Sequence, residues 1–126
     1  MNAPRRLPVL VTRRFERALE AILQHYESLR HLHPDAGSRA LRLIDLVERD
    51  LPRMLAANPD IGRPAQLSLT QSKSEQNWLE RLAPLTARRR LQAREWLLGD
   101  FWILYYRTAS AVYLVSVRHE RETAYH

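Results

Sequence analysis

The sequence predicts an α+β fold, in which two antiparallel helices pack on one face of an antiparallel sheet of three or four strands. Two observations predict it. Apolar residues recur with a helical period in the first half of the chain, and runs rich in Val, Ile, Tyr, Trp and Phe follow in the last third. A chain of 126 residues is long enough for one hydrophobic core and not for two. We therefore expect a single domain over residues 1–126.

The first helix is expected to follow a short strand. Leu7 to Val11 can form this strand at a sheet edge, because Pro8 has no amide hydrogen to donate. Thr12 can cap the next segment, whose apolar stripe consists of Phe15, Leu19, Ile22, Leu23, Tyr26 and Leu29.

A second helix is expected after the interruption at 31–34. Asp35 is a suitable N-cap, and the apolar stripe consists of Ala40, Leu43, Ile44, Val47 and Leu51. The short connection predicts an antiparallel helix pair. Pro52 should end or kink this helix, and Asp50 could cap a further turn.

The connection between the helices and the sheet is the least regular part of the sequence. Residues 58–64 have the composition of a turn. Ser72 and Glu75 have the spacing of a capping box, which predicts a short extra helix over 72–83 within the 65–92 connection. This helix is the candidate to cover the second face of the sheet.

Three apolar runs predict the sheet itself, as an antiparallel meander. They are Trp96–Leu98, Phe101–Tyr106 and Val112–Val117, and Gly99-Asp100 and residues 108–110 separate them. Strict alternation places Tyr113, Val115 and Val117 opposite Val112, Leu114, Ser116 and Arg118. Both sheet faces are then largely apolar. One can pack on the helices, and the other must meet another segment, a partner or a ligand.

The composition narrows the class of protein. The formal charge is +6 and Lys73 is the only lysine, so the cations are almost all arginine. This favours an anionic partner such as RNA, DNA or an acidic protein, although a GC-rich genome would give the same composition. The absence of cysteine fits a reducing cytoplasm. The apolar run near the N-terminus is too short for a signal peptide, and no run approaches a membrane span.

The order strand, helix, helix and antiparallel strands, with three local matches, resembles the RelE/ParE superfamily of type II toxin–antitoxin toxins. The matches are NPDIGRP at 58–64, GDFWILYY at 99–106 and VYLVSVRHERE at 112–122, while the 65–92 connection is longer than is usual in the family. The resemblance implies a small cytoplasmic bacterial protein that arrests growth unless its cognate antitoxin binds it. The antitoxin would cover exposed apolar sheet. A homodimer is possible, and no cofactor is expected.

Members of this superfamily have two different activities, and a member without toxicity is a third alternative for this chain. ParE-like members inhibit DNA gyrase and need no catalytic groups, whereas RelE-like members cleave mRNA on the ribosome and need a general base, a general acid and cations. A family member can also retain antitoxin binding without toxicity. Few acid–base groups occur on the central strands, which favours the ParE-like activity narrowly over the RelE-like one.

The candidate site residues lie in the meander and the tail. If the chain is a nuclease, His119 would exchange the proton. Arg118 and Arg121 would hold the phosphate, and Tyr125 would stack on a base or donate a hydrogen bond. Further candidates for binding are Arg94, Arg107, Trp102, Tyr106 and Glu122.

Each candidate also has a simpler structural explanation. His119 can be a hydrogen-bonded residue at the end of a strand, and the charged tail can simply be solvated. The arginines at strand ends can be ordinary surface cations, and the tyrosines can pack in the core. His25, His31 and His33 have a spacing that could bind a metal, but no carboxylate–histidine pattern accompanies them. We expect them to be surface residues and predict no metal site.

Overall fold

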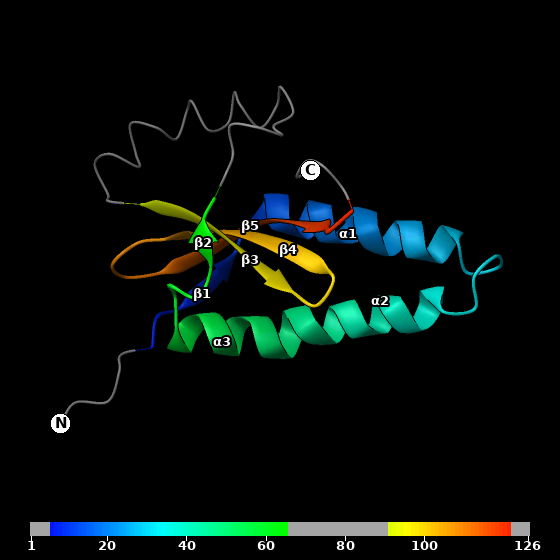
Figure 1. The fold of residues 1–126 in the computed structure, drawn as a ribbon, viewed down its shortest axis with the longest axis horizontal. Helices are drawn as coiled ribbons and strands as arrows, with labels where there is room; N and C mark the ends of the chain where they lie inside the picture. The colour runs from blue at the N-terminus through cyan, green and yellow to red at the C-terminus, as the bar shows by residue number, and fades with distance from the viewer. Residues whose placement is uncertain (1–5, 66–90, 122–126) are drawn as a thin grey trace, which may run out of the picture.

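Two helical segments form a hairpin against one face of a five-stranded sheet (Figure 1). The computed structural model describes residues 6–65 and 91–121. The helices are α1 (Arg13–Ser28), α2 (Ala36–Asp45), the π-helical turn η1 (Leu46–Asp50) and α3 (Leu51–Ala57). The strands are β1 (Val9–Val11), β2 (Arg63–Pro64), β3 (Gln92–Leu98), β4 (Phe101–Arg107) and β5 (Val112–His119).

The predicted α+β class, helix hairpin and meander are confirmed, but the predicted sheet is wrong in two respects. Within the described residues, the sheet has five strands in the order β1-β5-β4-β3-β2, not three or four. It is mixed rather than antiparallel, because β1 runs parallel to β5 with Val9 opposite Val112. The two-residue strand β2 pairs with β3 through Arg63 and Pro64, and so short a strand leaves no alternation to recognise in the sequence.

Thr12 joins β1 to α1 and connects both to the sheet. Its hydroxyl oxygen accepts a hydrogen bond from the Phe15 amide at 3.2 Å, so the predicted N-cap is confirmed. The same hydroxyl donates to the Leu114 carbonyl at 2.6 Å. One side chain thus sets both the start of α1 and its position beside β5.

The second helical segment contains the irregularity that Pro52 predicts. The Leu51 amide bonds to the Leu46 carbonyl, five residues back, and this wide turn separates α2 from α3. A proline here has no amide to donate, and its ring would clash with the carbonyl four residues earlier in a regular helix. Asp35 is the N-cap residue of α2, as predicted, but its backbone is itself helical in conformation and its side chain makes no capping hydrogen bond.

The two sheet faces form separate apolar clusters. The main core joins the helices to Phe101, Ile103 and Tyr105 of β4, all nearly inaccessible. On the opposite face, Leu104 and Tyr106 are also buried in the chain. The centre of this second face is thus not open to a partner. The helix predicted over 72–83 lies outside the described residues.

A β-bulge in β5 changes which side chains share a face. Leu104 pairs with Ser116 and Tyr105 pairs with Leu114, so Val115 has no partner across the ladder. Beyond the bulge, the alternation is shifted by one residue. Val117 therefore belongs to the main core with Leu114, which corrects the face assigned from strict alternation.

In the described part of the chain, no helix has the length and apolar content that crossing a bilayer requires.

Candidate functional site

The loop at 58–62 is fastened to the sheet by a buried tyrosine. The Tyr105 hydroxyl donates to the Pro59 carbonyl at 2.8 Å and accepts from the Gly62 amide at 2.9 Å. Burial raises the pKa of the Tyr105 phenol above its ordinary value, and the Gly62 hydrogen bond and the Arg94 charge oppose this shift more weakly. The phenol therefore remains protonated and keeps its donor at neutral pH.

Two of the candidate arginines hold the same loop. Arg94 donates from Nε to the Gly62 carbonyl at 2.8 Å and from Nη2 to the Asp60 carbonyl at 3.2 Å. Arg107 places Nε 2.7 Å from Asp60 Oδ1 in an ion pair. Both guanidinium groups thus make specific contacts that fix the loop, which is a structural role.

Gly62 is required by the closeness of this packing. A β-carbon at this position would lie 2.7 Å from the Glu95 carbonyl oxygen and 2.8 Å from the Tyr105 hydroxyl. Both neighbours are held, one in the backbone of β3 and the other in the core. The loop can approach the sheet only because residue 62 has no side chain.

Trp102 is the centre of a charged cluster on the second sheet face. The Arg63 guanidinium carbon lies 4.4 Å from the centre of the indole ring, and that of Arg118 lies 5.8 Å from it. Arg63 also pairs with the buried carboxylate of Glu95 at 2.9 Å. Arg118 stands directly opposite Trp102 in the β4–β5 ladder.

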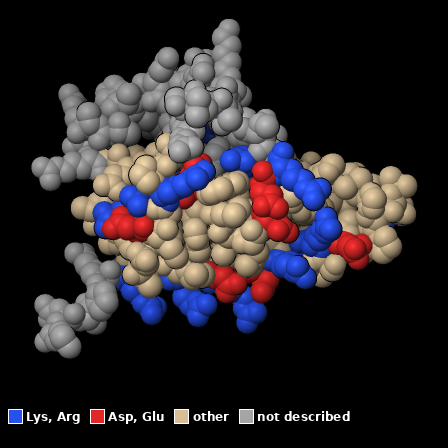
Figure 2. Space-filling view, viewed as in Figure 1, with Lys and Arg blue, Asp and Glu red and all other residues tan. Residues whose placement is uncertain are grey.

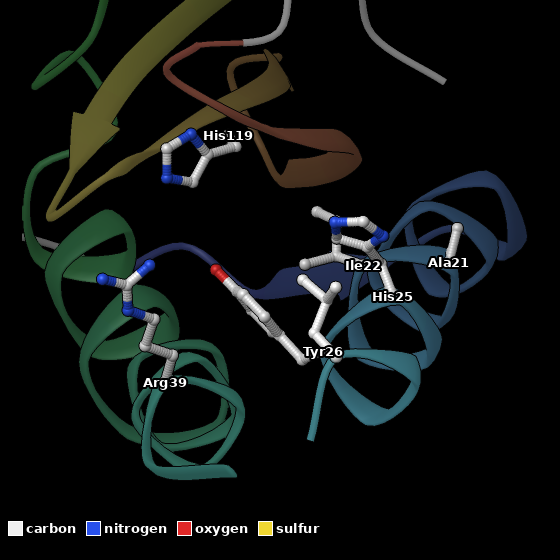
Figure 3. Close-up of a pocket in the computed structure, with 7 residues that line it drawn as sticks. Ala21, Ile22, His25, Tyr26, Arg39 and His119 are labelled. Atoms are coloured by element: carbon white, nitrogen blue, oxygen red, sulfur yellow. The ribbon is translucent and has the colours of Figure 1, made fainter. Parts of the chain in front are cut away.

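A hollow opens where the two helices meet the end of β5, and we name it the hairpin hollow. It encloses about 520 Å³. Its lining includes Ile22, His25 and Tyr26 from α1, Leu29 directly after that helix, Arg39 from α2 and His119 from β5. Figure 3 shows the Tyr26 hydroxyl and the His119 ring facing each other, with Arg39 on one side and His25 on the other.

The bulge at Val115 determines that His119 reaches the hairpin hollow. Strict alternation would put His119 on the second face with Tyr113, and Arg118 on the helix face. The shift reverses this, so His119 pairs with Phe101 and packs edge-on against its ring at 5.4 Å between centres. Its Nδ1 accepts from the Arg121 amide at 3.2 Å, which leaves the proton of a neutral ring on Nε2.

The structure therefore separates some of the sequence-predicted site residues, while the Arg121 amide stays bonded to His119. His119 lies in the hairpin hollow, while Arg118 and Trp102 lie on the opposite face of the sheet. Tyr106 is buried in the second apolar cluster, and Arg121 is exposed in the turn after β5. Glu122 and Tyr125 lie outside the described residues.

The hairpin hollow includes residues that sequence reasoning did not select. His25 was expected to be a surface residue and is exposed, yet it lines the hollow. Tyr26 was recognised only as part of the apolar stripe of α1, and it is buried with 9% of its surface accessible. Arg39 had no distinguishing signal in the sequence, because one arginine on a helix resembles its neighbours until the fold places it.

The charges on the visible face of the molecule are mixed. Figure 2 shows cations interspersed with carboxylates, without a single continuous basic patch on the part of this face that the described residues form. Along the second helical segment, Arg49 pairs with Asp45 at 3.1 Å and Arg53 with Asp50 at 3.6 Å. Exposed pairs of this kind stabilise a helix only slightly. The described part of this face does not present the basic stripe that would favour nucleic acid.

No protein-family model matches this chain, and no curated protein is significantly similar to it. In residues 6–65 and 91–121, no group of three or more His, Cys, Asp or Glu side chains is placed to hold a metal ion.

Proposed function

We propose that this chain is the toxin of a type II toxin–antitoxin system and that it acts in the ParE-like manner, by binding DNA gyrase in the cytoplasm. The strand, helix hairpin and antiparallel strands follow one another in the order on which the RelE/ParE resemblance rests. Fold-level likeness alone does not define a function. The choice between the two toxin activities depends on the placement of the candidate catalytic groups.

The dispersal of the candidate groups supports an interaction protein over a nuclease. Phosphoryl chemistry needs a proton-transferring group and cations within reach of one phosphate. His119 and Arg118 lie on opposite faces of the sheet, because they are adjacent in β5. Arg94 and Arg107 hold the 58–62 loop. Gyrase binding requires none of these groups to converge.

The proposed antitoxin contact lies at the margins of the second sheet face rather than its centre. Leu104 and Tyr106 are already buried there. Leu97 remains 41% exposed, and Trp102 and Tyr113 are half-buried. An antitoxin segment packed on these three side chains would bury apolar surface that the described chain leaves accessible.

A homodimer of the toxin is a second proposed assembly, at the edge strand β1. Val11 is 50% exposed and Leu10 is 46% exposed. Apolar residues on an edge strand favour pairing with another chain.

One observation favours the RelE-like alternative. His119 shares the hairpin hollow with Arg39 and Tyr26, which together could exchange a proton and hold one phosphate. Arg39 would then replace Arg118 as the phosphate-binding cation. This alternative predicts that His119→Ala abolishes toxicity while leaving the fold intact.

Induced expression in a bacterial host separates the possibilities. A gyrase inhibitor should give DNA breaks and filamentous cells with intact mRNA, and co-expression of the protein encoded next to this chain should restore growth. His119→Ala should remain toxic, as should the control His31→Ala, an exposed residue of the α1–α2 connection. Cleaved mRNA together with loss of toxicity in His119→Ala alone would select the nuclease. A tight complex with the neighbouring protein without growth arrest would indicate a non-toxic family member.

A further inference from the structure

The hairpin hollow has the size and composition of a small-molecule site. Its volume of about 520 Å³ falls in the range typical of ligand pockets. Ile22 of α1 and Leu29, which directly follows this helix, provide apolar walls, whereas the polar groups come from three separate elements. An apolar interior with a few convergent polar groups is the usual arrangement of a binding pocket.

The described side chains that line this hollow include a cation and no anion. Arg39 contributes a permanent positive charge, and His25 and His119 contribute imidazole rings. Among the described residues that line the hollow, none carries a carboxylate. Within residues 6–65 and 91–121, no carboxylate lies within ion-pair distance of the Arg39 guanidinium, in contrast to Arg49 on the same helical segment. The hollow is thus complementary to an anion.

A second, smaller hollow continues from the first. It encloses about 280 Å³ and shares Tyr26, Leu29 and Arg39 with the hairpin hollow. Asp35 lines only this smaller space, where it would repel an anionic group. The combined charges favour an anionic head group in the larger hollow, between Arg39 and His119.

We propose that the hairpin hollow binds a small molecule with one anionic head group, a carboxylate or a phosphate monoester, on a compact apolar body. Arg39 holds the head group through charge-assisted hydrogen bonds. Ile22 and Leu29 contact the apolar body, and the hydroxyl of Tyr26 lies beside the head group. This site is separate from the margins of the second sheet face, where the antitoxin is proposed to bind.

The test uses probes of similar size that share a phenyl ring and differ in the charge of the polar group. They are titrated into the isotope-labelled full chain, and binding is followed by amide chemical shifts. Phenylacetate is the anion, 2-phenylethanol the neutral analogue and 2-phenylethylamine the cation. Phenylacetate should bind with a dissociation constant of about 1 mM, as suits a fragment of this size. Its shifts should cluster at Tyr26, Arg39 and His119. The neutral analogue should bind at least about tenfold more weakly, because it forms no charge-assisted contact. Phenyl phosphate tests the second head group.

Variants assign the effect to the hollow. Arg39→Ala should weaken phenylacetate by roughly 10- to 100-fold while leaving 2-phenylethanol unchanged. Arg42→Ala, which removes the same charge from an exposed position of the same helix outside the hollow, should have no such effect. Arg39→Gln keeps most of the side-chain stem and replaces Arg39→Ala if that variant is not folded.

Three results would overturn the proposal: equal affinity for the anion and the neutral analogue, equal effects of Arg39→Ala and Arg42→Ala, or no clustered shifts up to ~20 mM of either anion. Toxicity does not enter the measurement. The site can therefore fail while the proposed function stands, and the reverse also holds.

Discussion

Tyr105→Phe tests whether the 58–62 loop depends on one hydroxyl group. The substitution keeps the ring in the core and removes only the oxygen. That oxygen accepts from the Gly62 amide and donates to the Pro59 carbonyl. Because Gly62 is buried, its amide would lose its partner without gaining water.

The expected loss of stability follows from these two groups. A buried polar group left without a partner costs about 1–3 kcal/mol. The Gly62 amide should incur most of this cost, whereas Pro59 is half-buried and water can partly replace the lost bond. We expect a total loss of about 2–4 kcal/mol, which is a large fraction of the roughly 5–15 kcal/mol typical of a domain.

Urea denaturation measures this loss, and hydrogen exchange locates it. The Gly62 amide should be protected in the wild type and should exchange faster in Tyr105→Phe. Tyr113→Phe is the matched control, since it removes the same atom from a half-buried ring on the other sheet face. A loss below about 0.5 kcal/mol with unchanged Gly62 protection would refute the role assigned to this hydroxyl.

Three further predictions concern the same scaffold. Gly62→Ala should destabilise the fold by at least about 2 kcal/mol in urea denaturation, because the added β-carbon would overlap the Glu95 carbonyl oxygen and the Tyr105 hydroxyl. The control Gly37→Ala adds a β-carbon that meets nothing within 4 Å, so it should be neutral or stabilising. Because burial raises the pKa of Tyr105 in the folded state, this group's contribution to stability should be complete below pH ~10 and should decline as the pH rises through the folded-state pKa. Urea midpoints across this alkaline range should fall less steeply for Tyr105→Phe than for the wild type. Thr12→Ala should cost about 1–2 kcal/mol by removing the cap of α1, and thermal unfolding beside the exposed control Ser38→Ala should detect it.

Features set by local sequence signals were predicted well. The cap at Thr12 and the irregularity at Pro52 each depend on a few neighbouring residues, so the sequence contains the whole cause. The fold class follows from periodicity for the same reason. The parallel pairing of β1 with β5 joins segments about a hundred residues apart, and no pattern within either segment specifies its direction.

The candidate site was harder to predict, because one β-bulge moves two of its residues, Arg118 and His119, to opposite faces from those that alternation predicts. Leu114, Val115, Ser116 and Val117 are all compatible with either face of this sheet, since both faces are largely apolar. The sequence therefore contains little information about where alternation shifts. The shift at Val115 exchanges the faces of Arg118 and His119, and so determines that His119, rather than Arg118, lies on the helix side of the sheet.

The arginines show a second limit of sequence reasoning. Arg94 binds main-chain carbonyls more than thirty residues away, and carbonyls have no signature in a sequence. Arg107 pairs with Asp60, which is still further away along the chain. Their structural role becomes visible only when the loop is placed beside the sheet.

The most direct test of the proposed function is a supercoiling assay with purified gyrase, relaxed plasmid DNA and the purified chain. We predict dose-dependent loss of supercoiling with accumulation of cleaved DNA, equal activity of His119→Ala, and reversal when the protein encoded next to this chain is added. Unimpaired gyrase, together with cleavage of ribosome-bound mRNA that His119→Ala abolishes without altering the melting transition, would contradict the proposal.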